Sequence, residues 1–423
     1  MLPYEGLPMP YNWRFKSLAI LIFLMRTLIV KNFGPIHNDE GVAVVIHPVT
    51  VFCGDQGTGK STVAKLISEF TWLEKALSRG DFLPKEITRY DRFRKKYCAF
   101  HNIQNYFKEN TYLFFDGDKY RFEYKDGHLS VQAKQMASYL RPQVFYIPAE
   151  RNLVSAIESA EKIKRLPPAL STLLDEYTKA LRSSRVPLEL PLPGYSVQYD
   201  RLNKVAWLVG DGFRIRTYEA ASGLQSVTPL SVVSNYLNSK VNENSLSDIV
   251  AESSEERQRL EKTVQAILRD KTIDDTLRVA LIKELNATVP NKRFVNIVEE
   301  PEQNLYPTSQ MAVLFELLRI KNTVPENELI FTTHSPYLIN YLTIALKAGI
   351  IRSQRSDSRI DEIIPPRCDI KPGQLAIYQL ESSGAITELP FVEGLPSDDN
   401  YLNDSLEETN RLFDRLLGFD VEG

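Results

Sequence analysis

Short apolar runs that alternate with segments of helical spacing set the layout of this chain. One run, residues 49–53, leads through a glycine-rich stretch into a segment of helical spacing at 61–78. Two more, at 294–298 and 328–332, precede helical segments at 309–320 and 336–346. A fourth run, at 143–147, ends close to the charged residues Glu150 and Arg151. Strands that alternate with helices predict an α/β fold with a mostly parallel sheet between helices.

Weaker local patterns predict the remaining elements. Strands are expected at 27–33 and 42–47, and helices at 86–108, 153–163, 170–182 and, as a charged pair, 253–287. Turn residues predict hairpins at 116–118, 126–127, 210–212 and 382–384. An amphipathic pattern predicts a last helix at 401–417.

The glycine-rich stretch after the first apolar run has the spacing of a phosphate-binding loop. Its residues, GDQGTGKST, are Gly54, Asp55, Gln56, Gly57, Thr58, Gly59, Lys60, Ser61 and Thr62. The glycines let backbone N–H groups turn around a phosphate, Lys60 reaches the outer phosphates, and the Ser61 hydroxyl can hold Mg²⁺ at the start of the helix. The strand before it and the helix after it are the context that this motif requires. The stretch predicts nucleotide binding.

Two adjacent carboxylates, Glu299 and Glu300, end the apolar run at 294–298. Successive side chains of a strand point to opposite faces, so these two have different roles. One can share the Mg²⁺ shell with Ser61, while the other faces the outer phosphate and orients the attacking water. Together with the loop at 54–62, the pair predicts hydrolysis of the bound nucleotide.

Five segments together resemble the head of an ABC-type ATPase, of the group that includes the SMC and RecF proteins and the ATPase half of the OLD nucleases. They are LIVKNFGPI at 28–36, GDQGTGKST at 54–62, AASGLQ at 220–225, VNIVEEPEQNLYP at 295–307 and TTHSPY at 332–337. The resemblance implies a mixed, mainly parallel sheet flanked by helices, with a helical lobe inserted between the P-loop and the signature AASGLQ. It also implies ATP and Mg²⁺ as ligands.

The same resemblance implies a role for each motif residue. Two heads would sandwich one ATP, with Ser222 and Gly223 acting in trans, so a homodimer or higher oligomer is expected. His334 matches the switch histidine at the γ-phosphate, and 302–305 matches the loop that crosses the dimer interface. We predict that Glu300, Lys60 and His334 are the catalytic residues, with Glu300 as the catalytic carboxylate. We predict that Glu299 and Ser61 are the metal ligands.

The motifs also depart from the family pattern in three places. Glu299 stands where the broad ABC group usually has aspartate, although the OLD-like branch resembles this chain in using two glutamates. Leu224 stands where the signature usually has its second glycine. A metal-contacting glutamine is expected after the strand at 143–147, and either Glu150 or Arg151 takes its coupling role or the glutamine lies elsewhere.

The motif order suggests a division of the 423 residues. We expect an N-terminal extension at 1–25, an N-terminal lobe with the P-loop at 26–150, and a helical lobe with the signature at 151–290. The C-terminal part of the ATPase core would cover 291–350, and a hairpin and helix 351–423. The apolar residues 17–25 are too few to span a bilayer, so we expect a cytoplasmic protein without a membrane anchor. The three cysteines lie far apart, as in a reducing compartment, and predict no zinc site.

Charge leaves DNA as a candidate ligand for one segment. The formal net charge of -3 argues against a protein that coats nucleic acid through bulk charge. The basic and aromatic segment 88–97 could contact phosphates, or it could be a solvated face whose Tyr90, Phe93 and Tyr97 form a buried stripe.

Two functions remain after these steps. In the first, ATP-driven dimerisation controls a separate effector, a nuclease or toxin, because compact heads of this kind resemble ATPase subunits of bacterial antiphage systems such as Septu, some retron systems and PARIS. In the second, a RecF-like repair ATPase acts on DNA directly. Between 151 and 222 there is no room for a long coiled coil. No nuclease is expected in the chain, because Asp361, Glu362, Asp398 and Asp399 lie in polar, loop-like sequence.

Overall fold

The computed structural model describes residues 25–37, 41–135, 139–158, 162–163, 165–251 and 290–421, with a few further positions between 266 and 281. Residues 1–24 of the predicted extension at 1–25 and most of the predicted helix pair at 253–287 lie outside these residues. Within them, no helix is both long and apolar enough to cross a bilayer.

A six-stranded sheet with the order β15-β14-β3-β13-β12-β7 forms the centre of the molecule. All strands from β14 to β7 run parallel, and β15 adds an antiparallel edge. Their bounds are β3 (Val49–Gly54), β7 (Pro142–Ile147), β12 (Arg293–Glu299), β13 (Glu328–Thr333), β14 (Leu375–Leu380) and β15 (Ile386–Glu388). Every residue of β3, β12 and β13 is buried, as expected for strands covered on both faces. The predicted mixed, mainly parallel sheet flanked by helices is confirmed.

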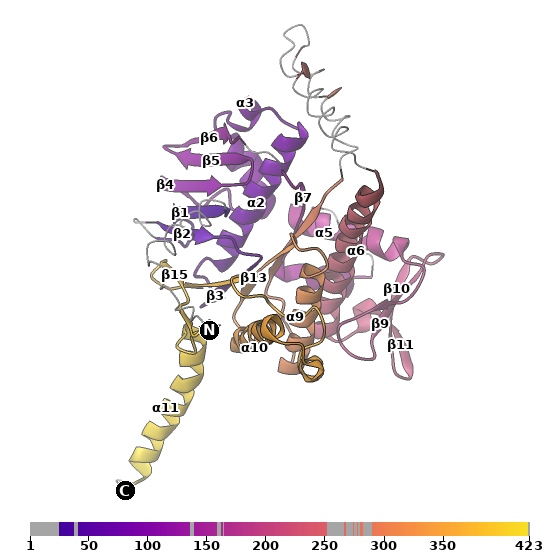
Figure 1. Cartoon of the computed structure of the whole chain (residues 1–423), viewed down its shortest axis with the longest axis vertical. Coiled ribbons are helices and arrows are strands. Elements are labelled where there is room, and N and C mark those ends of the chain that lie inside the picture. Colours follow the sequence, from indigo (N-terminus) through magenta and orange to yellow (C-terminus); the bar gives the residue numbers. More distant parts are fainter. Residues whose placement is uncertain are drawn as a thin grey trace, which may run out of the picture.

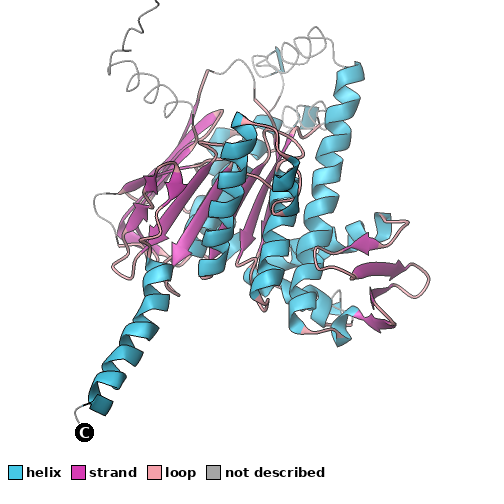
Figure 2. Ribbon diagram, turned by 60° about the horizontal axis from the view of Figure 1, so that its bottom comes forward, coloured by secondary structure: helices cyan, strands magenta, loops and turns pink. Residues whose placement is uncertain are grey.

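Different layers cover the two faces of this sheet. On one face lies α2 (Lys60–Arg79), which packs in one apolar cluster with Phe52 and with a second sheet. On the other face, Val51 and Cys53 pack with four helices (Figures 1 and 2). These are α5 (Pro168–Ser183), α6 (Ser222–Ala251), α9 (Pro307–Lys321) and α10 (Pro336–Gln354). The helices predicted at 61–78, 170–182, 309–320 and 336–346 are therefore confirmed.

The second sheet is antiparallel and lies against α2 (Figure 1). Its strands, in spatial order, are β2 (Val42–Val45), β1 (Thr27–Phe33), β4 (Phe107–Asp116), β5 (Tyr120–Lys125) and β6 (His128–Ala133). Phe70 of α2 stacks on Phe115 of β4 with ring centroids 5.3 Å apart. The hairpins predicted at 116–118 and 126–127 join β4 to β5 and β5 to β6.

The helix predicted at 86–108 is wrong. This stretch holds a short helix α3 (Pro84–Ile87), one π-helical turn η1 (Phe93–Tyr97) and one 3₁₀ turn η2 (Cys98–His101). Left-handed backbone at Asp91 (φ 61°) and Asn102 (φ 57°) interrupts any continuous helix. Phe93 and Tyr97 are buried as the stripe requires, but Tyr90 is 76% exposed, so the predicted three-residue stripe is only partly formed.

The helix predicted at 153–163 is also wrong in length. The 3₁₀ turn η3 (Ala149–Asn152) leads into the short helix α4 (Leu153–Ala156), which ends there because the backbone of Ile157 is extended. A third sheet follows α5, with strands β8 (Leu188–Glu189), β9 (Ser196–Asp200), β10 (Val205–Gly210) and β11 (Phe213–Arg216), so the inserted lobe is not purely helical. Its last two strands form the hairpin predicted at 210–212. The 3₁₀ turn η5 (Thr217–Glu219) then leads to α6.

The C-terminal part returns to the central sheet. After the 3₁₀ turn η6 (Ser358–Glu362), β14 and β15 form the hairpin predicted at 382–384. Two short strands, β16 (Phe391–Val392) and β17 (Leu395–Pro396), precede α11 (Tyr401–Val421). The predicted last helix is confirmed, and it projects away from the body of the molecule (Figure 1).

Candidate active site

The loop between β3 and α2 has a backbone that depends on glycine. Gly54, Gly57 and Gly59 have φ values of 135°, 81° and 105°, which L side chains rarely adopt. A Cβ atom at Gly54 would lie 2.2 Å from the carbonyl oxygen of Leu380, whereas one at Gly57 would meet nothing within 4 Å. The loop is therefore pinned to β14 at its start and open at its middle. Open backbone N–H groups at the start of a helix can bind an anion.

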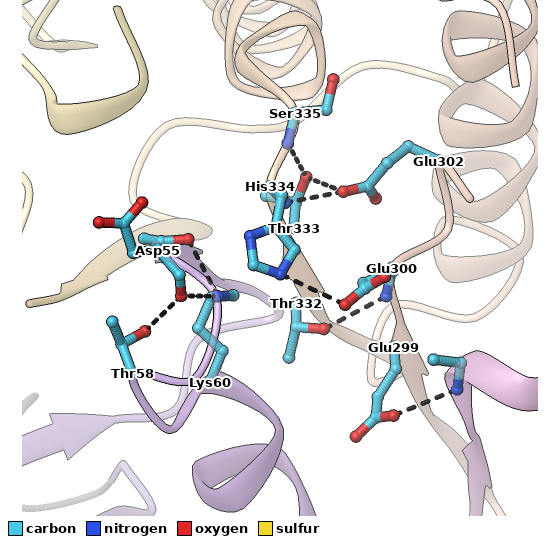
Figure 3. Close-up of polar contacts among 12 residues, drawn as sticks. Asp55, Thr58, Lys60, Glu299, Glu300, Glu302, Thr332, Thr333, His334 and Ser335 are labelled. Carbon is cyan, nitrogen blue, oxygen red and sulfur yellow. Dashed lines mark hydrogen bonds and ion pairs between the residues drawn. The ribbon is translucent and has the colours of Figure 1, made fainter. Parts of the chain in front are cut away.

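Lys60 is folded back over this loop. Its Nζ donates hydrogen bonds to the carbonyl oxygens of Gly54 at 2.9 Å and Asp55 at 2.5 Å (Figure 3). Thr58 Oγ1 donates to the Asp55 carbonyl at 2.8 Å. Burial lowers the pKa of Lys60 to about 8, although the charge of Glu300 opposes that shift. The ammonium thus lies inside the loop, where a phosphate would bind.

Glu299, the last residue of β12, is buried and held on the α2 side of the sheet. Its carboxylate accepts hydrogen bonds from the Tyr146 hydroxyl and, at 3.1 Å, from the Ala149 N–H. Lys65 Nζ lies 3.8 Å from Glu299 Oε1, and Lys65 follows Ser61 by one helical turn. An ionised carboxylate has about four acceptor positions, so two hydrogen bonds leave Glu299 able to bind a cation. The Ser61 hydroxyl and the Glu299 carboxylate are oxygen donors of the kind that Mg²⁺ binds.

Glu300 points toward His334 on the side where Lys60 lies (Figure 3). Its carboxylate Oε1 is 3.3 Å from His334 Nε2, and this contact holds the pKa of Glu300 below its usual value. The backbone of Glu300 is left-handed, with φ 43°, and its N–H donates to the carbonyl oxygen of Thr332 at 3.0 Å. Strained backbone of this kind is often found at functional sites. Glu300 and His334 thus form a pair, and the charge of Glu300 also acts on the Lys60 ammonium.

Glu302 orients the histidine through the backbone. Its Oε1 accepts hydrogen bonds at 2.7 Å from Thr333 Oγ1 and from the His334 N–H (Figure 3). Burial raises the pKa of Glu302. The sequence suggested only that Glu302 belongs to a loop, and this inward contact with β13 was not predicted.

Arg151 is the site residue that sequence reasoning assigned least clearly. Its side chain is fully buried and donates to the carbonyl oxygens of Glu299 at 2.6 Å, Glu300 at 2.7 Å and Ser226 at 3.3 Å. Burial lowers its pKa to about 10, against the nearby carboxylates. Of the two residues kept open for the coupling role, Glu150 is exposed, whereas Arg151 joins the end of β12 to α6.

Ser222 and Gly223 begin α6, where Ser222 is exposed. A Cβ atom at Gly223 would lie 2.7 Å from the carbonyl oxygen of Asn304, so only glycine allows α6 to approach the loop that follows Glu300. The helix packs chiefly on α4, α5, α9 and η3. The structure thus places this pair against the loop after β12.

No other candidate metal site emerges from the described part of the chain, which contains no group of three or more His, Cys, Asp or Glu residues that could hold an ion. All three cysteines are buried and free.

Comparison with solved structures gives distant similarities. The SMC head domain from Thermotoga maritima is 10% identical, with 87% of this chain and 99% of that chain covered and a TM-score of 0.34. The recombination mediator protein RecF is 12% identical, with coverage of 86% and 99% and a TM-score of 0.31. For cbiO1 from Clostridium perfringens, part of an ABC transporter complex, the values are 12%, 94%, 100% and 0.29. No protein-family model and no curated protein matches the chain. Similarities this weak carry no functional weight, so function rests on the residues of the site.

Proposed function

We propose that this protein binds ATP with Mg²⁺ and hydrolyses it to ADP and phosphate, as an ATPase of the ABC type. The observation that carries the proposal is the pair of Glu300 and His334, whose side chains are 3.3 Å apart and whose carboxylate interacts electrostatically with the P-loop Lys60. The loop at 54–59 would hold the phosphates, and Ser61 and Glu299 would hold Mg²⁺, which neutralises charge on the β- and γ-phosphates when bound.

The chain's own residues then position the reaction. Glu300 orients a water molecule and accepts its proton as the water oxygen bonds to the γ-phosphorus and the bond to the β-phosphate oxygen breaks. His334, held by Glu302 at its backbone, contacts the γ-phosphate. Lys60 gives up its carbonyl contacts to reach the outer phosphates.

The test is ATP turnover by Glu300→Gln, with Glu388→Gln on the exposed edge strand β15 as the matched control. Glu300→Gln should still bind ATP but lose turnover by about a hundredfold or more, because the phosphate cradle is intact and the proton acceptor is gone. Lys60→Ala should weaken binding itself. Near wild-type turnover by Glu300→Gln would show that Glu300 is not the carboxylate that accepts the proton of the attacking water.

We further propose that two chains close head to head on ATP and that this closure controls a separate effector, a nuclease or toxin, in antiphage defence. The exposed Ser222 at the start of a 30-residue helix supports the first step, because such a helix start can bind the phosphate of a nucleotide held by another chain. Cells carrying this gene with its neighbours should resist phage, and the Glu300→Gln form should not. Equal resistance with both forms would contradict control by hydrolysis, and DNA-stimulated turnover without any effector would favour the RecF-like alternative.

A further inference from the structure

A cavity of about 420 Å³ lies between α2, β7, η2 and α5, and nothing in the proposed ATPase reaction uses it. Its volume is within the range of small-molecule sites, about 300–1,000 Å³. Aromatic residues supply much of its lining, and one of them, Trp72, is 40% exposed. The other aromatic lining residues are Tyr97, Phe100, Phe145 and Tyr146. Flat apolar walls of this kind suit a planar ring, which gains stacking or edge contacts in addition to buried area.

Two buried polar groups face this cavity without full hydrogen bonding. His101 is 3% exposed, and its Nδ1 has no hydrogen-bond partner among the described residues. Its Nε2 lies 3.9 Å from the carboxyl of Glu69, which is also buried. Burial lowers the pKa of His101 to about 3 and raises that of Glu69, so both favour their neutral forms. A buried polar atom left without a partner destabilises the fold, and a ligand atom that bonds it would remove that penalty.

Two basic side chains also line the same cavity. Lys75 and the exposed Lys96 both line it. Burial, together with the guanidinium groups of Arg79 and Arg141, lowers the pKa of Lys75 to about 7. The lining acid Glu176 already pairs with Lys179 at 2.6 Å. An anion bound here would offset the repulsion among these cations.

We propose that this cavity binds a small molecule with a planar aromatic ring and an anionic group. The ring would lie against Trp72 and Phe100, and the anion would pair with Lys75 and Lys96. A ligand that also carries a polar ring atom could bond His101 Nδ1. This cavity is separate from the proposed ATP site, because its lining residues on α2 begin two turns beyond the P-loop.

The cavity is also connected to the proposed ATPase site by one side chain. The ring of Tyr146 lines the cavity and packs edge-on against His101, with centroids 4.6 Å apart, while its hydroxyl donates to the carboxylate of Glu299. A ligand that moves this ring would therefore move the hydrogen bond on the metal-binding carboxylate. This second step rests on the proposed ATPase function, whereas binding does not.

Binding is tested by calorimetry on the full chain with 2-naphthoate, a planar ring with a carboxylate, and with neutral 2-naphthylmethanol of the same shape. We expect saturable one-to-one binding of 2-naphthoate and binding of the neutral compound about tenfold weaker, the loss expected for one charge-assisted hydrogen bond. Lys75→Met should weaken 2-naphthoate about tenfold, and Lys125→Met, at an exposed site outside the cavity, should not. Absence of saturable binding, or equal affinity for the two compounds, would overturn the proposal.

Coupling is tested by ATP turnover with 2-naphthoate at saturation. In the wild type we expect turnover to change about fivefold, the lower end of usual allosteric coupling. Tyr146→Phe keeps the ring but lacks the hydroxyl, so it should bind the probe with turnover unresponsive to it. Binding without any effect on wild-type turnover would refute the coupling and leave the site. Absence of ATP hydrolysis under all conditions would refute the proposed function, while calorimetry would still decide whether the cavity binds the probe.

Discussion

Replacing Arg151 by methionine tests how the acid pair is held in place. The guanidinium is fully buried and makes two short hydrogen bonds to the carbonyl oxygens of Glu299 and Glu300, at 2.6 and 2.7 Å. Two longer ones, at 3.3 and 3.5 Å, go to Ser226 and Pro148. Methionine is an unbranched side chain that can fill much of the space of the buried arginine, but it donates no hydrogen bond.

The expected loss of stability follows from those contacts. A hydrogen bond from a charged donor contributes about 1.5–3 kcal/mol, so the two short bonds contribute about 3–6 kcal/mol. Burying the guanidinium is itself unfavourable, as its pKa of about 10 indicates, and methionine removes that penalty. We therefore expect Arg151→Met to lower the free energy of unfolding by about 2–4 kcal/mol.

Urea unfolding followed by circular dichroism measures this change, with Arg319→Met as the control. Arg319 is an exposed arginine of α9 that pairs with Glu316 at 2.8 Å, so its replacement should lower stability by about 0.5 kcal/mol or less. Arg151→Lys should fall between the two variants, because one ammonium cannot span the carbonyl oxygens that a planar guanidinium reaches. ATP turnover by Arg151→Met should also fall about tenfold or more, since Glu300 loses its backbone support. If Arg151→Met matched Arg319→Met in both measurements, the bonds to Arg151 would not hold the site.

Three further predictions test the site and the proposals. Burial lowers the pKa of Lys60 to about 8 and bound ATP favours the charged form, so ATP affinity should be constant below pH 8 and fall above it by up to about tenfold per unit. Equilibrium binding across pH 8 measures this, and Lys60→Arg should remove the slope. Mixing Lys60→Ala chains with Ser222→Arg chains should restore turnover through one intact composite site per heterodimer, and heterodimers without turnover would contradict the trans role of Ser222. The purified chain with ATP and Mg²⁺ or Mn²⁺ should leave linear and supercoiled DNA uncut, and cleavage that disappears when Asp398 and Asp399 become asparagine would reveal a nuclease site.

The strands that carry the acids and the P-loop could be predicted because their signal is local. β3, β12 and β13 are buried along their whole length, so each reads as one continuous apolar run. The carboxyl ends of parallel neighbours lie at the same edge, which is why Lys60 and His334 could be expected near Glu300. The order of the motifs was therefore enough to predict that these residues lie at the same edge of the sheet.

Prediction failed where distant contacts decide the local structure. Residues 86–108 are rich in helix-compatible residues, but Phe93 packs on Phe70 of α2, with ring centroids 5.4 Å apart, and left-handed Asp91 and Asn102 turn the chain twice. Likewise, β14 lies parallel to β3, which is more than 300 positions away, and the sequence near 375–380 does not indicate which strand it pairs with. Tertiary packing overrides local propensity in both cases.

Arg151 shows why the connection between lobes could not be seen in the sequence. A charged residue after an apolar strand suggests a ligand contact, yet the three shortest hydrogen bonds of Arg151 go to backbone carbonyl oxygens 75, 148 and 149 positions away. Because every residue has a backbone carbonyl oxygen, the sequence does not indicate which of them accept these hydrogen bonds. The same guanidinium holds Ser226, in the first turns of the helix that begins at Ser222, and the backbone of Glu300. If two heads close on ATP as proposed, a shift of α6 would therefore reach Glu300 through two hydrogen bonds, the one from Arg151 to Ser226 and the one from Arg151 to Glu300.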